Sequence, residues 1–141
     1  MTVPTSALTR HHAGASDALR RPILTDLARV YELRGDYVTA ASTYTAVLPA
    51  GGTRDGPAYI ALVGLGNIAM RAGRFAEARR HVEEGLTYYT EQGNLPRRAA
   101  LLHNLAFCAQ EQGELHAARR GYEEACALKR ALCQQASLLI S

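Results

Sequence analysis

Histidines and carboxylates are the side chains of this sequence that could perform acid–base chemistry. The candidates are His81, His103 and His116, with Glu77 and Glu111 among the acids. General acid–base catalysis needs such a group within hydrogen-bond reach of its partner. His103 and Glu111 are the best pair, because both are expected on one face of a helix, two turns apart. The chain has no nucleophile elbow, phosphate-binding loop or zinc-binding helix, so the sequence predicts no enzyme activity.

The three cysteines do not have the spacing of a metal site. Cys108 and Cys126 fall in apolar stripes, which predicts buried thiols, whereas Cys133 lies near the end of the chain and is expected to be exposed. His11 and His12 are adjacent but have no third ligand nearby. We therefore expect no metal ion and no cofactor.

The formal net charge is only +3, and arginines alternate with acids along the chain. Two Arg-Arg pairs are each followed within four residues by two glutamates, a spacing that lets opposite charges pair on one helical face. They are Arg79/Arg80 with Glu83/Glu84 and Arg119/Arg120 with Glu123/Glu124. These self-neutralised faces argue against nucleic-acid binding. Because the sequence shows no signal peptide or membrane-spanning run, we expect a cytoplasmic protein that does not bind membranes.

Prolines and glycines divide the chain into helical segments. Proline suits the first turn of a helix, and glycine suits the residue after its end, where the backbone is left-handed. This pattern predicts three helices bounded by Pro22 and Gly35, Pro57 and Gly73, and Pro96 and Gly113. A second segment with helical periodicity follows each glycine. We therefore expect about six helices, preceded by a flexible N-terminal arm over residues 1–20 that is rich in Thr, Ser, Ala, Gly and Pro.

One structural unit is used three times. Gly35, Gly73 and Gly113 are 38 and 40 residues apart, and a long fixed period indicates stacked repeats. Apolar and small residues recur at the same offsets, namely Leu27, Leu65 and Leu105; Ala28, Gly66 and Ala106; Tyr37, Phe75 and Leu115; Ala40, Ala78 and Ala118; and Tyr44, Val82 and Tyr122. The units span about residues 21–54, 57–95 and 96–133 of one repeat domain, 21–141, which ends in a short C-terminal tail.

These offsets resemble the tetratricopeptide repeat over about Arg21 to Arg130. The resemblance implies an all-α fold in which three helix-turn-helix hairpins stack into a right-handed superhelix. The periods exceed the 34 residues of the common form, and "LHNLAFCAQEQGELHAARRGYEEACALKR" looks like the kinesin-light-chain type and like repeats of bacterial transcriptional regulators. The excess of arginine over lysine suggests a GC-rich, bacterial genome.

In the tetratricopeptide family the first helix of each unit lines a concave groove. The resemblance implies that the residues binding a peptide or partner there are Arg29, Val63, Asn67, Arg71, His103, Asn104, Phe107 and Glu111. An asparagine amide both donates and accepts hydrogen bonds, so it can hold the backbone of an extended peptide. The alternative is that Asn67 and Asn104 bond a neighbouring helix or water. A carboxylate clamp is disfavoured, because Val63 takes the place of the lysine that clamp-forming relatives have there.

The resemblance favours a non-catalytic scaffold or adaptor that binds a peptide or partner protein and has a regulatory role. The alternative is a small accessory protein or enzyme of a bacterial biosynthetic pathway that uses the groove for a small molecule. The tail "ALCQQASLLIS" ends in apolar residues without a polar capping helix. Three explanations stay open: the tail folds back as a lid, it meets a partner such as a second copy in a homo-oligomer, or the chain is a fragment of a longer array.

Overall fold

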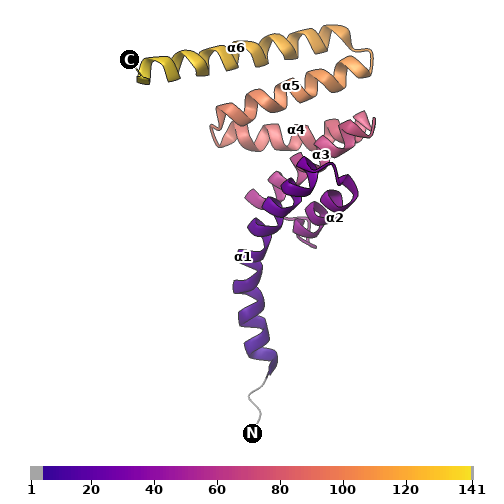
Figure 1. The fold of residues 1–141 in the computed structure, drawn as a ribbon, viewed down its shortest axis with the longest axis vertical. Helices are drawn as coiled ribbons and strands as arrows, with labels where there is room; N and C mark the ends of the chain where they lie inside the picture. The colour runs from indigo at the N-terminus through magenta and orange to yellow at the C-terminus, as the bar shows by residue number, and fades with distance from the viewer. Residues whose placement is uncertain (1–4, 141) are drawn as a thin grey trace. The chain divides into compact units, whose positions relative to one another are not determined.

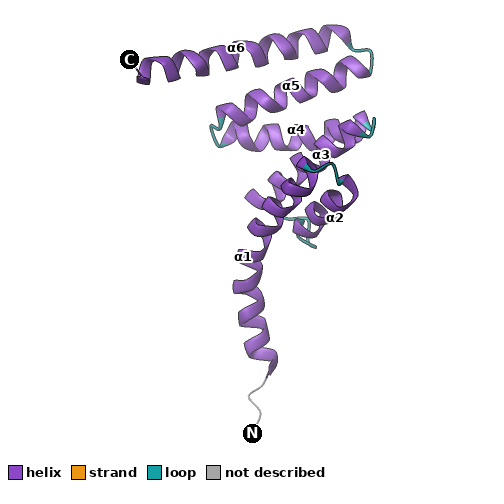
Figure 2. Ribbon diagram, viewed as in Figure 1, coloured by secondary structure: helices purple, strands orange, loops and turns teal. Residues whose placement is uncertain are grey.

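The computed structural model describes residues 5–140 of the chain, with side chains from residue 18 onward. The described residues form six helices and no strand (Figure 2), which confirms the predicted all-α fold. The helices are α1 (Thr5–Leu33), α2 (Tyr37–Val47), α3 (Gly56–Arg71), α4 (Phe75–Glu91), α5 (Leu95–Glu111) and α6 (Leu115–Ile140), labelled in Figure 1. The chain divides into two compact units between Ala61 and Leu62, inside α3.

Four of the turns between helices share one hydrogen-bond pattern at a left-handed glycine. At Gly35, where φ is 83°, the Asp36 N–H donates to the Tyr31 carbonyl at 2.9 Å and the Gly35 N–H donates to the Glu32 carbonyl at 3.0 Å. This Schellman motif satisfies the last carbonyls of the helix, and it needs a residue without a Cβ clash at positive φ. The same pattern occurs at Gly73, Gly93 and Gly113. The predicted helix ends at Gly35, Gly73 and Gly113 are confirmed.

The start of the first helix differs from the sequence prediction. Proline suits a first turn, but it does not oblige a helix to begin there. The four residues before Pro22 are Ala, Leu, Arg and Arg, which are strong helix formers, and α1 runs through them from Thr5 with Pro22 in its interior. The predicted helix start at Pro22 is therefore wrong. Part of the segment expected as a flexible arm, residues 5–20, is helical, and residues 1–4 lie outside the described residues.

Arg21 connects three segments of the first unit. Its Nη1 and Nη2 donate to Asp55 Oδ2 and Oδ1 at 2.6 and 2.8 Å, and its Nε donates to the Val47 carbonyl at 2.9 Å. Asp55 Oδ1 also accepts from the Ala58 N–H in the first turn of α3, at 3.1 Å. Arg21 thus ties α1 to the end of α2 and to the start of α3. These bonds, chiefly those from Arg21, hold the pKa of Asp55 below its usual value.

The second unit is built on close contacts between α3, α4, α5 and α6. Figure 1 shows α5 lying between α4 and α6. One core cluster consists of Val63, Val82, Tyr89 and Leu101, and a second consists of Ala69, Ala78 and Cys108. Small residues let the helices approach. A Cβ added at Gly121 of α6 would lie 2.9 Å from the Cβ of Ala106 on α5, closer than two carbon atoms pack.

The exposure of one of the three cysteines differs from the prediction. Cys108 is fully buried, as expected, and burial raises the pKa of its thiol. Cys133 is exposed, also as expected. Cys126 is exposed, so the prediction of a buried thiol there is wrong. Cys126 lies beside the part of α6 that packs on α5, where Gly121 approaches Ala106 and where Ala118 and Ala125 are buried.

Replacing Asp55 with Asn tests the Arg21 connection. Asn keeps the acceptor for the Ala58 N–H but removes the charge, so we expect the unfolding free energy at neutral pH to fall by about 1 kcal/mol. Because the folded-state pKa of Asp55 is lowered, its stabilisation is fully present above the unfolded pKa, about 3.9, and is lost as pH falls through the folded-state value. The difference from wild type should therefore disappear in acid.

Urea denaturation followed by circular dichroism, repeated from neutral to acid pH, measures this effect. Asp26→Asn, an exposed position of α1, is the matched control. Equal losses of stability in the two variants, or a loss that does not depend on pH, would show that Arg21 is not a structural tie.

Replacing Gly121 with Ala tests the α5–α6 approach. Alanine favours helix over glycine by about 1 kcal/mol, so an open site would gain stability. Here the new Cβ meets the Cβ of Ala106, which cannot rotate away, and the two helices must separate. We expect a net loss of about 1–2 kcal/mol of unfolding free energy, with Lys129→Ala, at an exposed position of α6, unchanged. A gain in stability at Gly121 would mean that the helices are not in close contact.

Candidate functional site

Helix α5 presents one buried side and one open side. Its N-terminus is fixed by Asn94, whose side chain accepts from the Arg97 N–H at 3.2 Å, and by Pro96 in the first turn. Leu101, Leu102, Ala106, Cys108 and Ala109 are buried. With 3.6 residues per turn, the opposite side carries the positions between them. We call the surface formed by Asn67 and Arg71 of α3 with His103, Asn104, Phe107 and Glu111 of α5 the α3–α5 face.

A pair of asparagine amides lies at the centre of the α3–α5 face. Asn104 Nδ2 donates to Asn67 Oδ1 at 3.2 Å, and both side chains are partly buried. The structure thus shows the neighbouring-helix bond that was the alternative to peptide binding. An amide has two N–H groups and an oxygen with two lone pairs, and this bond uses only one donor and one acceptor. The bond restrains both amides, and each keeps further hydrogen-bonding groups that this contact does not use.

Aromatic rings flank the amide pair on the α5 side. His103 lies edge-on to Tyr122 of α6 with ring centroids 5.2 Å apart, and the Tyr122 hydroxyl donates to Gln110 Oε1 at 2.9 Å. Burial, followed by the nearby Glu111 carboxylate, raises the pKa of Tyr122, so the hydroxyl remains protonated and keeps donating. On the α4 side, Phe107 is 37% exposed and stacks edge-on with Phe75 at 5.9 Å. The face therefore combines amide groups with ring surfaces that neighbouring helices hold in place.

The structure removes Val63 from the expected binding set. Val63 is only 7% exposed and belongs to the cluster with Val82, Tyr89 and Leu101. Gly85 of α4 makes this possible, since a Cβ there would lie 2.6 Å from Val63 Cγ2. The expectation that Val63 faces a ligand is therefore wrong. Its position on α3 turns inward, because α4 comes close enough to cover it.

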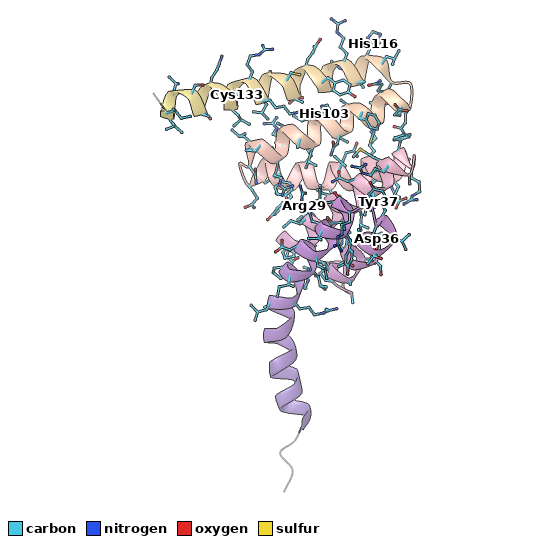
Figure 3. The ribbon with its side chains drawn as sticks, in the orientation of Figure 1. Arg29, Asp36, Tyr37, His103, His116 and Cys133 are labelled. Atoms are coloured by element: carbon cyan, nitrogen blue, oxygen red, sulfur yellow. The ribbon has the colours of Figure 1, made fainter. Side chains whose placement is uncertain are left out.

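The remaining predicted residues are accessible. Arg71 and Glu111 are exposed and each is the last residue of its helix, α3 or α5. Arg29 is exposed on α1 and belongs to the other compact unit. Figure 3 labels Arg29 on α1, His103 on α5 and His116 near the start of α6. The predicted residues of the second unit are brought together in the α3–α5 face.

The pair His103 and Glu111 does not form a catalytic dyad in this geometry. Eight residues of helix separate the two positions by about 12 Å along the axis, well beyond hydrogen-bond reach. The ring contact of His103 is instead with Tyr122. Among the described residues, no group of three His, Cys, Asp or Glu side chains could hold a metal ion. In the same part of the chain, no helix is both long and apolar enough to cross a membrane.

Two aromatic members of the site were not predicted from the sequence. The sequence pattern places Tyr122 and Phe75 at recurring apolar positions, where they match Tyr44 and Tyr37 of the first unit. The hydroxyl of Tyr44 in the first unit donates to Glu32 Oε1 at 3.2 Å. This bond is equivalent to that of Tyr122 to Gln110, two repeats later. Only the packing of α6 shows that His103 lies against the ring of Tyr122.

The predicted charge pairs are present on the second helices. Arg79 binds Glu83 at 3.3 Å and Arg119 binds Glu123 at 2.9 Å, both at a spacing of four residues. Arg79 also reaches across to the start of α6, where Glu114 Oε2 lies 2.9 Å from its Nη1. The bond from Glu114 is the main reason that the pKa of Arg79 is raised. One ion pair of each predicted group of four is thus present, and Glu124 binds Arg98 of α5 at 3.3 Å.

Comparison with protein families agrees with the repeated hairpins. Two family models, each described as tetratricopeptide repeat, match residues 23–57 and residues 58–131, and the second match alone covers more than half of the chain. A search of curated proteins finds no match. The kinesin-light-chain-like subtype stays a prediction. The repeated helix pairs, their left-handed glycine turns and these matches together show that the chain belongs to the tetratricopeptide repeat family.

Proposed function

We propose that this protein is a non-catalytic scaffold that holds an extended segment of a partner protein on its α3–α5 face. Tetratricopeptide repeats generally mediate protein–protein interaction. The observation that carries the proposal is the bond between Asn104 and Asn67. It uses one N–H of Asn104 and one lone pair of Asn67, so both amides keep donor and acceptor capacity, and an extended peptide backbone offers a carbonyl and an N–H in alternation.

The rest of the face suits such a ligand. Phe107 offers exposed ring surface for an apolar side chain, and its contact with Phe75 restricts its rotamer. Arg71 and Glu111 provide opposite charges at the C-terminal ends of α3 and α5. Because the amides and rings are already held by neighbouring helices, binding orders few protein side chains, which lowers the entropic cost of association. The proposed partner is therefore a peptide segment with both apolar and charged side chains.

Several finer expectations remain proposals. We include Arg29 among the binding residues through the family resemblance, and we propose protein partners and not nucleic acid. An adaptor role in regulation, a bacterial source and a cytoplasmic location rest on the sequence alone. The alternative, a pathway protein that binds a small molecule, is not favoured by a particular contact in the described residues.

Affinity measurements on a displayed-peptide selection test the proposal. Peptides would be selected on the immobilised protein, and the dissociation constant of the best one would be measured for wild type, Asn104→Ala and Asn67→Ala. We expect each variant to weaken binding about tenfold, or 1.4 kcal/mol. The double variant should lose less than the sum of the two, because the amides act as a pair.

Gln134→Ala, which removes an exposed amide near the end of α6, is the matched control and should bind like wild type. Circular dichroism would confirm that all variants remain helical. A selected peptide that binds both asparagine variants as tightly as wild type would place recognition elsewhere and refute the proposed site.

A further inference from the structure

The contact between α4 and α5 provides a template for how a further helix pair would dock on this protein. On α5, Leu101 and Leu105 pack with the cluster that contains Val82 and Leu86 of α4, and Cys108 packs with the cluster that includes Phe75. At the edge of the contact, Arg79 of α4 forms an ion pair with Glu114, a residue that follows α5. Both sides of this internal interface recur elsewhere in the chain, because the units repeat.

The face of α1 that corresponds to the α4-binding side of α5 is exposed. When Gly35 is aligned with Gly113, the residues Ile23, Leu27 and Val30 take the places of Leu101, Leu105 and Cys108. Leu101 and Cys108 are 2% and 0% exposed, whereas Ile23, Leu27 and Val30 are 62%, 41% and 47% exposed. Three apolar side chains at helical spacing therefore meet water on α1, where their equivalents on α5 form a core.

The face of α6 that corresponds to the α5-binding side of α4 is exposed at both ends. When Gly73 is aligned with Gly113, the residues Leu115, Tyr122 and Cys126 take the places of Phe75, Val82 and Leu86. Leu115 is 67% exposed and Cys126 is exposed, whereas their equivalents Phe75 and Leu86 are partly buried in the two core clusters. Tyr122 is partly buried through its contact with His103. A largely apolar hollow of about 360 Å³ lies on this face and is lined by Tyr122, Glu123, Cys126, Ala127 and Arg130.

The charges at the edge of the template recur as well. Arg119 of α6 is the equivalent of Arg79, and Asp36 after α1 is the equivalent of Glu114. Arg119 is 78% exposed and binds Glu123 as Arg79 binds Glu83. Asp36 is exposed too. If α1 of one molecule lay on α6 of another as α5 lies on α4, Arg119 would meet the carboxylate of Asp36 as Arg79 meets that of Glu114.

Each of the two helices, α1 and α6, is also longer than the helix whose place it would take in the template. The α5 helix begins at Leu95, which corresponds to residue 17, but α1 begins earlier, at Thr5. The α4 helix ends at Glu91, which corresponds to Ala131, but α6 continues to Ile140. In the antiparallel arrangement of α4 and α5, these two extensions would lie side by side. Leu139 and Ile140, which are 89% and 88% exposed, would then face helix and not water.

We propose that the protein associates with itself head to tail, with α1 of one molecule docked on α6 of the next in the register of α5 on α4. A second copy is the occupant that fits, because this chain carries both complementary surfaces and the matching charges. The contact joins two different surfaces, so the molecule at each end of a row still has one unpaired surface. The assembly is therefore an open array, or a ring if the two ends meet. This goes beyond peptide binding on the α3–α5 face and does not depend on it.

Mixing two blocked variants tests the arrangement. Ile23→Glu places a charge on the α1 face, and Cys126→Glu places one on the α6 face, both at exposed positions that should leave the fold intact. In sedimentation velocity under reducing conditions, we expect wild type to form dimers and larger species with rising concentration, and each variant alone to stay monomeric. An equal mixture should form dimers and nothing larger, because only one open pair of faces remains.

Ala100→Glu, at an exposed position of α5 outside both faces, is the control and should associate like wild type. Three outcomes would overturn the proposal. If wild type stays monomeric to about 100 μM, the two faces do not bind a second copy, and any occupant would be another protein. Association of Ile23→Glu but not of Cys126→Glu would indicate α6 packed on α6. A mixture that remains monomeric would show that the two faces do not bind each other.

A disulfide test examines the register. The template places Ile23 of one molecule in the same cluster as Cys126 of the next, as Leu101 and Leu86 share a cluster in the second unit. With Cys133 replaced by Ser, mild oxidation of an Ile23→Cys variant should give disulfide-linked species that join residues 23 and 126, identified by peptide mass spectrometry. Ala100→Cys in the same background should give no such link. Equal crosslinking of both variants to Cys126 would contradict the register.

Discussion

The close approach of neighbouring helices at glycine and alanine positions is the constraint on which the rest of this structure depends. A Cβ at Gly85 would lie 2.6 Å from Val63, and one at Gly121 would lie 2.9 Å from Ala106. Because the residues at these contacts are small, α4 approaches α3 and α6 approaches α5 closely enough for the larger residues around them to interlock. In the same unit the amides of Asn67 on α3 and Asn104 on α5 lie within hydrogen-bond distance, 3.2 Å apart.

The amide pair explains how a structural contact and a binding surface can be the same feature. A bond between two side chains on different helices stabilises their relative position, but it uses only one of the four hydrogen-bonding sites of each amide. Both residues are only partly buried, and the bond restricts the rotation of their amides. Peptide recognition of the proposed kind needs fixed groups of this sort, because flexible ones would lose entropy on binding. Tyr122 and Phe75 act similarly on the rings of His103 and Phe107.

A repeat protein also has a property that a globular domain lacks: each internal interface is a template for its end surfaces. Leu101 and Cys108 are buried because α4 lies beside α5, whereas Ile23 and Val30 occupy the same repeat positions on α1 and are exposed. The difference lies in the neighbours and not in the residue types. The arginine at the edge of the α4–α5 contact shows the same relation, since Arg79 has a partner in Glu114 and Arg119 has the same chemistry at an open surface.

Much of the fold could be predicted from the sequence, because its determinants are local. Left-handed glycines at fixed spacing specify where helices end, and small residues at equivalent offsets specify which sides pack, so the hairpins and the burial of Ala78, Ala106 and Cys108 followed from the pattern. Pro22 misled the prediction of the first helix start, since proline permits a first turn without requiring one. Of the candidate site, the sequence identified Asn104 and His103 but could not decide their partners. The tertiary structure decided three further points: that Val63 points to Gly85 and not to a ligand, that Cys126 is not covered, and that the two asparagines meet. Each of them depends on how near a second helix comes.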